Sequence, residues 1–134
     1  KPENAFVANF IGENNRLMGT VESIDGEKAT VKTDSGDIVV ASKVNVNKAG
    51  ERATLSLRPE RIMVSPSKGK TPNTYSAKVE ELIYHGDHIR TRFNVCGHDD
   101  FIVKIPNSIG NVSLKEGKEV NIGWMSEDCL ALDG

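Results

Sequence analysis

The sequence predicts a mainly β protein built from two small, related barrels. From Arg16 onward, short runs that alternate apolar and polar residues follow one another. Single glycines and polar turns separate these runs, and one pattern recurs in both halves of the chain. Long helical periodicity is absent. Many short strands at regular spacing are typical of small barrels or a sandwich, and the repeat favours two barrel-like units.

The elements expected along the chain are short. Apolar spacing in residues 6–11 predicts one short helix that ends at Gly12. Strands are predicted at residues 19–24, 28–33, 37–42, 53–57, 61–65, 75–84, 88–95, 100–105, 119–124 and 129–132. Asp25-Gly26 and Ser35-Gly36 suit hairpin corners between the early strands. The stretch SPSKGKTPNT, residues 65–74, reads as an exposed connection.

The repeat sets the predicted domain boundaries. Residues 50–60 align without gaps to residues 117–127, and residues 19–24 resemble residues 77–82. In both copies a glutamate then leads into a short apolar strand. We therefore expect residues 1–15, which hold the short helix, to precede the first repeat. Residues 16–66 form the first barrel repeat, 67–74 a connection and 75–134 the second repeat. Whether the two barrels share strands stays open at this point.

A proline-marked corner stands out in the first copy. Pro59 has no N–H for a sheet ladder, so the chain must leave the preceding strand there. Glu60 could accept hydrogen bonds from backbone amides at the corner, pair with a basic residue, or contact another subunit; a structural role is favoured. The candidate residues of this corner are Leu57, Arg58, Pro59 and Glu60, and those of the second copy are Trp124 and Glu127.

Composition excludes several classes of protein. The formal net charge is −2 and aromatic residues make up 5% of the chain. Nucleic-acid binding, which needs a basic surface and exposed aromatic rings, is therefore not expected. No apolar run approaches the roughly 20 residues that span a bilayer, and the start of the chain does not resemble a signal peptide. No G-x-x-x-x-G-K-[ST] phosphate loop is present, so this chain is not expected to hydrolyse ATP.

Other reactive residues favour plain structural roles. Candidate metal ligands are His85, His88, Cys96, His98 and Asp99, but positions three apart on a strand, such as His85 and His88, point to opposite faces. Turn histidines and two free thiols are the expectation, with no metal or cofactor. The acidic pairs at 99–100 and 127–128 could attract a cation or a polyamine, although solvated turns are favoured. Trp124 is expected in the core.

A family resemblance covers almost the whole chain. The order PENAFVANFIGENN, then GTV, then LRPE resembles the C-terminal extension of ATP-binding subunits of bacterial ABC importers. LRPE, here ending at Glu60, is similar to the motif of the accessory domain called TOBE, which has an oligonucleotide-binding-like barrel fold. Tyr84-His-Gly86 and the ending IGWMSEDCLALD resemble the polyamine (spermidine/putrescine) branch.

The resemblance implies a non-catalytic regulatory and dimerisation domain, with the tail of the preceding ATPase domain in residues 1–15. Its expected partners are a second copy of the same subunit, an ATPase domain in the same chain that would bind ATP and magnesium, and, indirectly, membrane permease subunits. Its expected location is the cytoplasm, at the inner face of the membrane. The alternative is a free-standing module that binds a small oxyanion or a polyamine.

Overall fold

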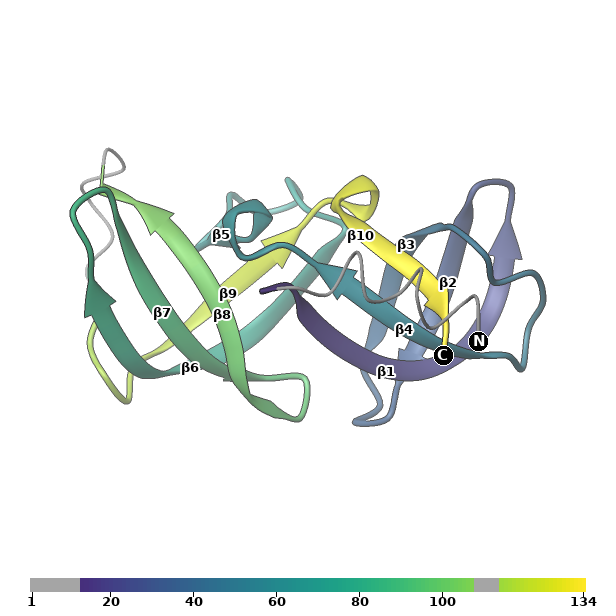
Figure 1. The fold of residues 1–134 in the computed structure, drawn as a ribbon, viewed down its shortest axis with the longest axis horizontal. Coiled ribbons are helices and arrows are strands. Elements are labelled where there is room, and N and C mark those ends of the chain that lie inside the picture. Colours follow the sequence, from purple (N-terminus) through teal and green to yellow (C-terminus); the bar gives the residue numbers. More distant parts are fainter. Residues whose placement is uncertain (1–12, 108–113) are drawn as a thin grey trace.

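The computed structural model describes residues 13–107 and 114–134, and they are mainly β (Figure 1). The strands are β1 (Asn15–Asp25), β2 (Lys28–Thr33), β3 (Ile38–Lys43), β4 (Arg52–Leu57), β5 (Met63–Val64), β6 (Asn73–Tyr84), β7 (His88–Val95), β8 (His98–Pro106), β9 (Glu119–Trp124) and β10 (Cys129–Asp133). The predicted fold class is confirmed. The helix predicted at residues 6–11 lies outside the described residues. None of the helices in the described part is long and apolar enough to cross a membrane.

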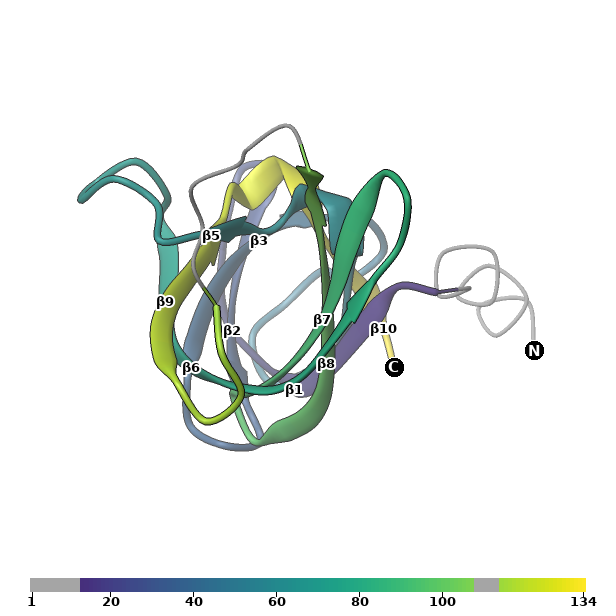
Figure 2. The same ribbon diagram turned by 90° about the vertical axis from the view of Figure 1, so that its left-hand side faces the viewer.

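The strands form two units that lie side by side (Figure 1). The first is a closed barrel in the order β1-β2-β3-β10-β4, and the second is a five-stranded sheet in the order β5-β9-β6-β7-β8. Figure 2 looks onto the second sheet and shows its strands curling around a common axis. Within the described residues, only the first unit closes by strand pairing, through the parallel contact of β10 with β3.

Each half of the chain gives its last strand to the other unit. β10 pairs with β4 of the first barrel, and β5 pairs with β9 of the second sheet. The predicted boundaries, 16–66 and 75–134, therefore describe the repeat in the sequence but not the two units in space. The reason is the corner that follows β4 and β9, because it turns the chain out of one unit and into the other. Strand sharing, left open by the sequence, is the organising feature of the fold.

The repeat extends to details of the backbone. β1 carries a bulge between Val21 and Ser23, and β6 carries one between Val79 and Glu81. Gly50 and Gly117 both have positive φ values, +93° and +86°, and each donates its N–H to the carbonyl oxygen of the valine before the bulge, at 2.8 and 2.7 Å. Glycine suits these positions because it tolerates positive φ without a Cβ clash. The two halves are thus copies of one structural pattern.

Two asparagines form hydrogen bonds that join the two units. Asn15, the first residue of β1, donates from Nδ2 to the Ile102 carbonyl oxygen on β8 and accepts from the Ile102 N–H, both at 2.7 Å. Asn73, the first residue of β6, binds Val40 on β3 in the same way, at 2.9 and 2.8 Å. Both asparagines are buried. Each asparagine side chain therefore makes the two hydrogen bonds that a backbone residue of a neighbouring strand would make, and it makes them across the junction between the units.

The core is continuous between the two units, because one cluster of buried residues includes Leu55 of the first unit and Phe93 of the second. Trp124 is fully buried, with its ring centroid 5.1 Å from Tyr75 and 5.7 Å from Phe101. This confirms the core position expected for the tryptophan. Both cysteines are free, as expected, and burial raises the pKa of the Cys96 and Cys129 thiols to about 12. Neither thiol is therefore ionised enough at neutral pH to act as a nucleophile.

We predict that Asn15→Ala and Asn73→Ala each lower the free energy of unfolding by about 1–3 kcal/mol, because each leaves a strand's N–H and C=O without partners. Urea unfolding measures the change. Asn94→Ala is the matched control, since Asn94 is exposed on β7. Losses no larger than that of the control would show that the asparagines do not hold the junction.

Candidate functional site at the two corners

The two corners have the same backbone course. One 3-10 helix spans Pro59–Arg61 and the other spans Ser126–Asp128. The residues before them, Arg58 and Met125, are extended, with φ/ψ of −75°/137° and −80°/150°. In each corner the last helical N–H donates to the carbonyl oxygen of that preceding residue, at 3.1 Å. Proline suits the first helical position because its φ is preset and its N–H is not needed there.

The sequence-predicted site residues separate into two groups. Leu57 and Pro59 in the first corner, and Trp124 in the second, are buried, so they hold each corner against the core. Arg58, Glu60 and Glu127 are exposed. The two corners lie along the same edge of the ribbon, near the place where the two units meet (Figure 1).

The idea that the Glu60 carboxylate accepts hydrogen bonds at the corner is wrong. Glu60 has no hydrogen bond or ion pair within the part of the chain that the structure describes, and its side chain is exposed. The physical reason is the 3-10 helix itself, because the carbonyl of Arg58 already accepts the N–H of Arg61. Glu60 is therefore free to meet a group outside this chain.

A groove of about 310 Å³, the corner groove, opens beside the first corner. It runs between β5 and the end of β8, where the second sheet lacks the parallel pairing that closes the first barrel. Its lining residues are Glu60, Arg61, Ile62, Met63, Val64, Lys104, Ile105, Pro106 and Asp128. The floor is therefore apolar and the rim is charged. Such a surface suits contact with another protein segment, since apolar area and charge pairing both contribute there.

The rim of the corner groove carries both signs of charge. Glu60 and Arg61 of the first corner and Asp128 of the second line the groove, whereas Arg58 and Glu127 belong to the corners but lie outside its lining. Lys104 from β8 also lines the groove, while its ammonium group donates to Glu13 Oε1 at 2.6 Å. No group of three or more histidine, cysteine or acidic residues in the described ranges is placed to hold a metal ion.

Among the described residues, the histidines named as candidate metal ligands do not gather into a metal-binding cluster. The rings of His85 and His88 stack with centroids 4.6 Å apart, and His88 Nδ1 lies 2.7 Å from an Asp87 carboxylate oxygen. His98 faces Asp100 at 3.9 Å. The turn and edge positions expected for these histidines agree with this arrangement.

The two units exchange their last strands at repeated corners, which is the architecture of a pair of small, related barrels. A sequence profile described as the TOBE domain matches residues 55–132, from the end of β4 to β10. The chain belongs to the TOBE domain family.

Individual relatives agree over most of the chain. The spermidine/putrescine import ATP-binding protein PotA of Rubrobacter xylanophilus is 31% identical over 99% of this chain and 35% of its own length. The PotA protein of Roseobacter denitrificans is 37% identical over 90% of this chain and 33% of its length. The chain therefore spans about a third of the length of these relatives.

A solved structure shares the fold. The cytoplasmic molybdate-binding protein ModG superposes with a TM-score of 0.77 at 14% identity, over 90% of this chain and 96% of its own. At that identity the likeness establishes the two-unit architecture alone.

Sequence reasoning missed the groove's second wall. Lys104, Ile105 and Pro106 come from β8, and nothing in the local pattern shows that β8 faces β5 rather than pairing with it. The lengths of the apolar runs gave no signal either, since the run at 61–65 is predicted to be longer than the run at 129–132. The apolar run at 61–65 gives only a two-residue strand, because the 3-10 helix takes its first residue, whereas β10 has five residues.

We predict that Glu60→Ala changes the free energy of unfolding by less than about 0.5 kcal/mol, as expected for an exposed side chain without partners. Ile62→Ala, two residues away and buried, should cost about 2–4 kcal/mol because it leaves a cavity. Denaturant unfolding compares the two variants. A loss from Glu60→Ala that approaches the loss from Ile62→Ala would restore the structural role.

Proposed function

We propose that this chain is the regulatory and dimerisation domain of the ATP-binding subunit of an ABC importer that takes up polyamines. The observation that carries the proposal is the similarity to spermidine/putrescine import ATP-binding proteins over nearly all of this chain. The remaining length of those relatives leaves room for an ATPase domain that would bind ATP and magnesium. The domain itself is non-catalytic. Through its partners it would work in the cytoplasm, at the inner face of the membrane, in indirect contact with permease subunits.

The exposed residues of the two corners, which together form the corner surface, suit a contact between two copies. A two-fold contact uses the same patch on both copies, so the patch must be complementary to itself. The corner surface meets this condition because arginines flank one corner and carboxylates flank the other. Rotation about a two-fold axis can place Arg58 of one copy against Glu127 of the other. Two Arg58–Glu127 pairs then form, one on each side of the two-fold axis, beside the corner groove.

Such a contact would act mechanically. Paired domains would hold two ATPase domains together while the nucleotide sites open and close. The contact need not be strong, since the attached ATPase domains raise the effective concentration of one domain near the other. An effector that binds one arrangement of the pair better than another would shift the population between them.

A second candidate function rests on the fold. ModG, whose architecture this chain shares, is described as binding molybdate. A free-standing module that binds a small oxyanion or a polyamine is therefore the alternative.

The reading frame upstream of Lys1 separates the two functions. The importer function predicts a phosphate loop in frame with this chain, within the stretch that an ATPase domain occupies. Sequencing the coding region from the source DNA tests this. An initiator codon directly before Lys1 would contradict the importer function and leave the free-standing module.

We predict weak self-association of the isolated chain, with a dissociation constant in the micromolar range or above, because the corner groove offers limited apolar area. Sedimentation velocity from about 10 micromolar to about 1 millimolar covers that range. Glu127→Arg should weaken association, and adding Arg58→Glu should restore it, since the swap exchanges the two signs. Added salt should weaken the wild-type contact.

Glu22→Arg is the matched control for charge reversal, because Glu22 is exposed on β1. A strictly monomeric chain at the highest concentration would count against dimerisation. Association that the Glu127→Arg variant leaves unchanged would place the contact elsewhere on the surface.

A further inference from the structure

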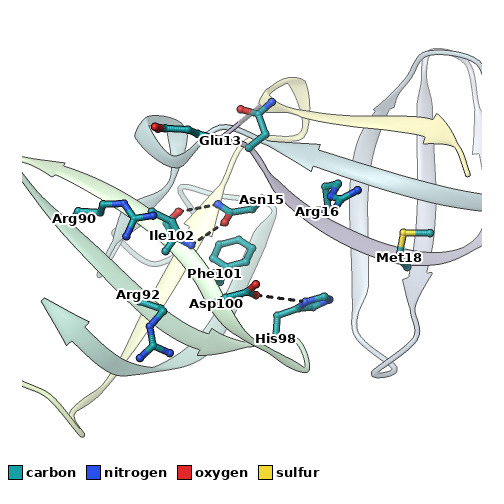
Figure 3. A pocket seen from close by; sticks show the side chains of 11 residues that line it. Glu13, Asn15, Arg16, Met18, Arg90, Arg92, His98, Asp100, Phe101 and Ile102 are labelled. Carbon is teal, nitrogen blue, oxygen red and sulfur yellow. Dashed lines mark hydrogen bonds and ion pairs between the residues drawn. The ribbon is translucent and has the colours of Figure 1, made fainter. Parts of the chain in front are cut away.

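A second hollow, the inter-barrel cleft, lies between the two units beside the Asn15 junction (Figure 3). It has a volume of about 570 Å³ and is formed by the chain from Glu13 to Met18 on one side and by β7 and β8 on the other. Figure 3 shows Phe101 near its middle, with Arg90 and Arg92 on one side and Arg16 on the other. The cleft is separate from the corner groove, with which it shares none of its lining residues.

The charge of the cleft is locally opposite to that of the whole chain. Its lining includes three arginines and two carboxylates, whereas the chain has a net charge of −2. Both carboxylates are already engaged. Glu13 accepts a hydrogen bond from Lys104, which lies outside the cleft and lowers the pKa of Glu13, and Asp100 faces His98 at 3.9 Å. Glu13 attracts Arg90 only weakly, because Lys104 is the larger cause of its lowered pKa, so three arginines against two carboxylates leave the cleft with an excess of positive charge.

Two of the arginines are available to a ligand. Arg92 is held in place, since it donates to the Asp99 carbonyl oxygen at 2.7 Å and lies 3.5 Å from a Glu81 carboxylate oxygen. Arg16 and Arg90 have no hydrogen bond or ion pair with any residue that the structure describes. A guanidinium presents a fork of N–H donors that matches the two oxygens of a carboxylate or phosphate.

The second junction is an internal comparison that shows what the architecture itself requires. The strand registers place Thr74 there in the position of Arg16, Thr30 in that of Arg92 and Lys28 in that of Arg90. Lys28 is used structurally, because it donates to Ser126 Oγ at 2.9 Å. The asparagine clamp thus forms equally well without this group of arginines, so their presence at the Asn15 junction is not explained by the fold.

The second junction is also bridged, and the first is left open. Tyr75 donates its hydroxyl to the Ile38 carbonyl oxygen across the second junction. Its counterpart in the first half is Leu17, which is buried and has no hydroxyl. At the floor of the open cleft lies Phe101, which is only 2% exposed. An apolar floor lowers the local dielectric, so charge interactions above it are stronger than on an open surface.

We propose that the inter-barrel cleft binds a small anion with at least two anionic groups, held between Arg16 on β1 and Arg90 on β7, with Arg92 completing the basic wall. The ligand chemistry is that of phosphate or carboxylate oxygens. The sign of the cleft is opposite to that expected for a polyamine site. This inference does not rest on the proposed importer function, because it depends only on the junction's geometry.

Pyrophosphate and citrate are the probes, one for each anion chemistry, and spermidine is the cationic counterpart. Binding is followed by calorimetry and by the fluorescence of Trp124, the only tryptophan, whose ring lies 5.7 Å from Phe101. We expect at least one anion to bind and spermidine not to compete with it. Arg16→Gln and Arg90→Gln should each weaken binding by about tenfold or more, since each removes a charged donor.

Lys32→Gln is the control for loss of one positive charge, because Lys32 is exposed on β2, away from the cleft lining. It should leave the affinity unchanged, and the thermal midpoints without ligand should show that all variants are folded. Binding of pyrophosphate alone assigns the site to phosphate groups, and binding of citrate alone assigns it to carboxylates. The proposal is overturned if neither anion binds, if Arg16→Gln and Arg90→Gln bind as well as wild type, or if spermidine displaces the anion.

Discussion

Each half of this chain depends on the other for a strand and for the partners of a buried asparagine. Without β10, the first barrel would be a four-stranded sheet with two open edges, and unpaired edges are costly and prone to association. Asn15 and Asn73 repeat the same dependence on a smaller scale, because each satisfies a backbone segment of the opposite unit. The two units therefore cannot form separately, and we expect them to unfold in one cooperative transition.

Both candidate surfaces lie where the two copies of the pattern differ. The first barrel closes because β10 is long enough to reach β3, while the shorter β5 leaves the corner groove open beside β8. Tyr75 bridges one junction, while the other keeps a cleft lined by arginines. The positions that the two copies of the repeat have in common form the framework of the fold. Residues that differ between the copies are therefore less constrained by folding. Departures from internal symmetry are for that reason a useful guide to binding sites in this fold.

The sequence predicted local structure well and spatial assignment poorly. Alternation located nearly every strand, and the repeat anticipated the matching corners, because both depend on neighbouring residues. It could not show which sheet β5 and β10 join, since a strand of either unit has the same alternating pattern. Asn15 falls in the segment expected to precede the first repeat, although it is buried in the structure as the first residue of β1. Arg16, Arg90 and Arg92 are far apart in the sequence, and only the junction between the units brings them together.

One strand connects the two candidate surfaces. β8 contributes Phe101 to the inter-barrel cleft and Lys104 to the corner groove, and the Lys104 ammonium binds Glu13 at the cleft. An anion between Arg16 and Arg90 would repel the Glu13 carboxylate and weaken its hold on Lys104. Lys104 would then present more positive charge to the corner groove, where acidic groups of a second copy would meet it. Coupling between two sites requires that each ligand favour the same arrangement, and the Lys104–Glu13 pair is the physical element on which both would act.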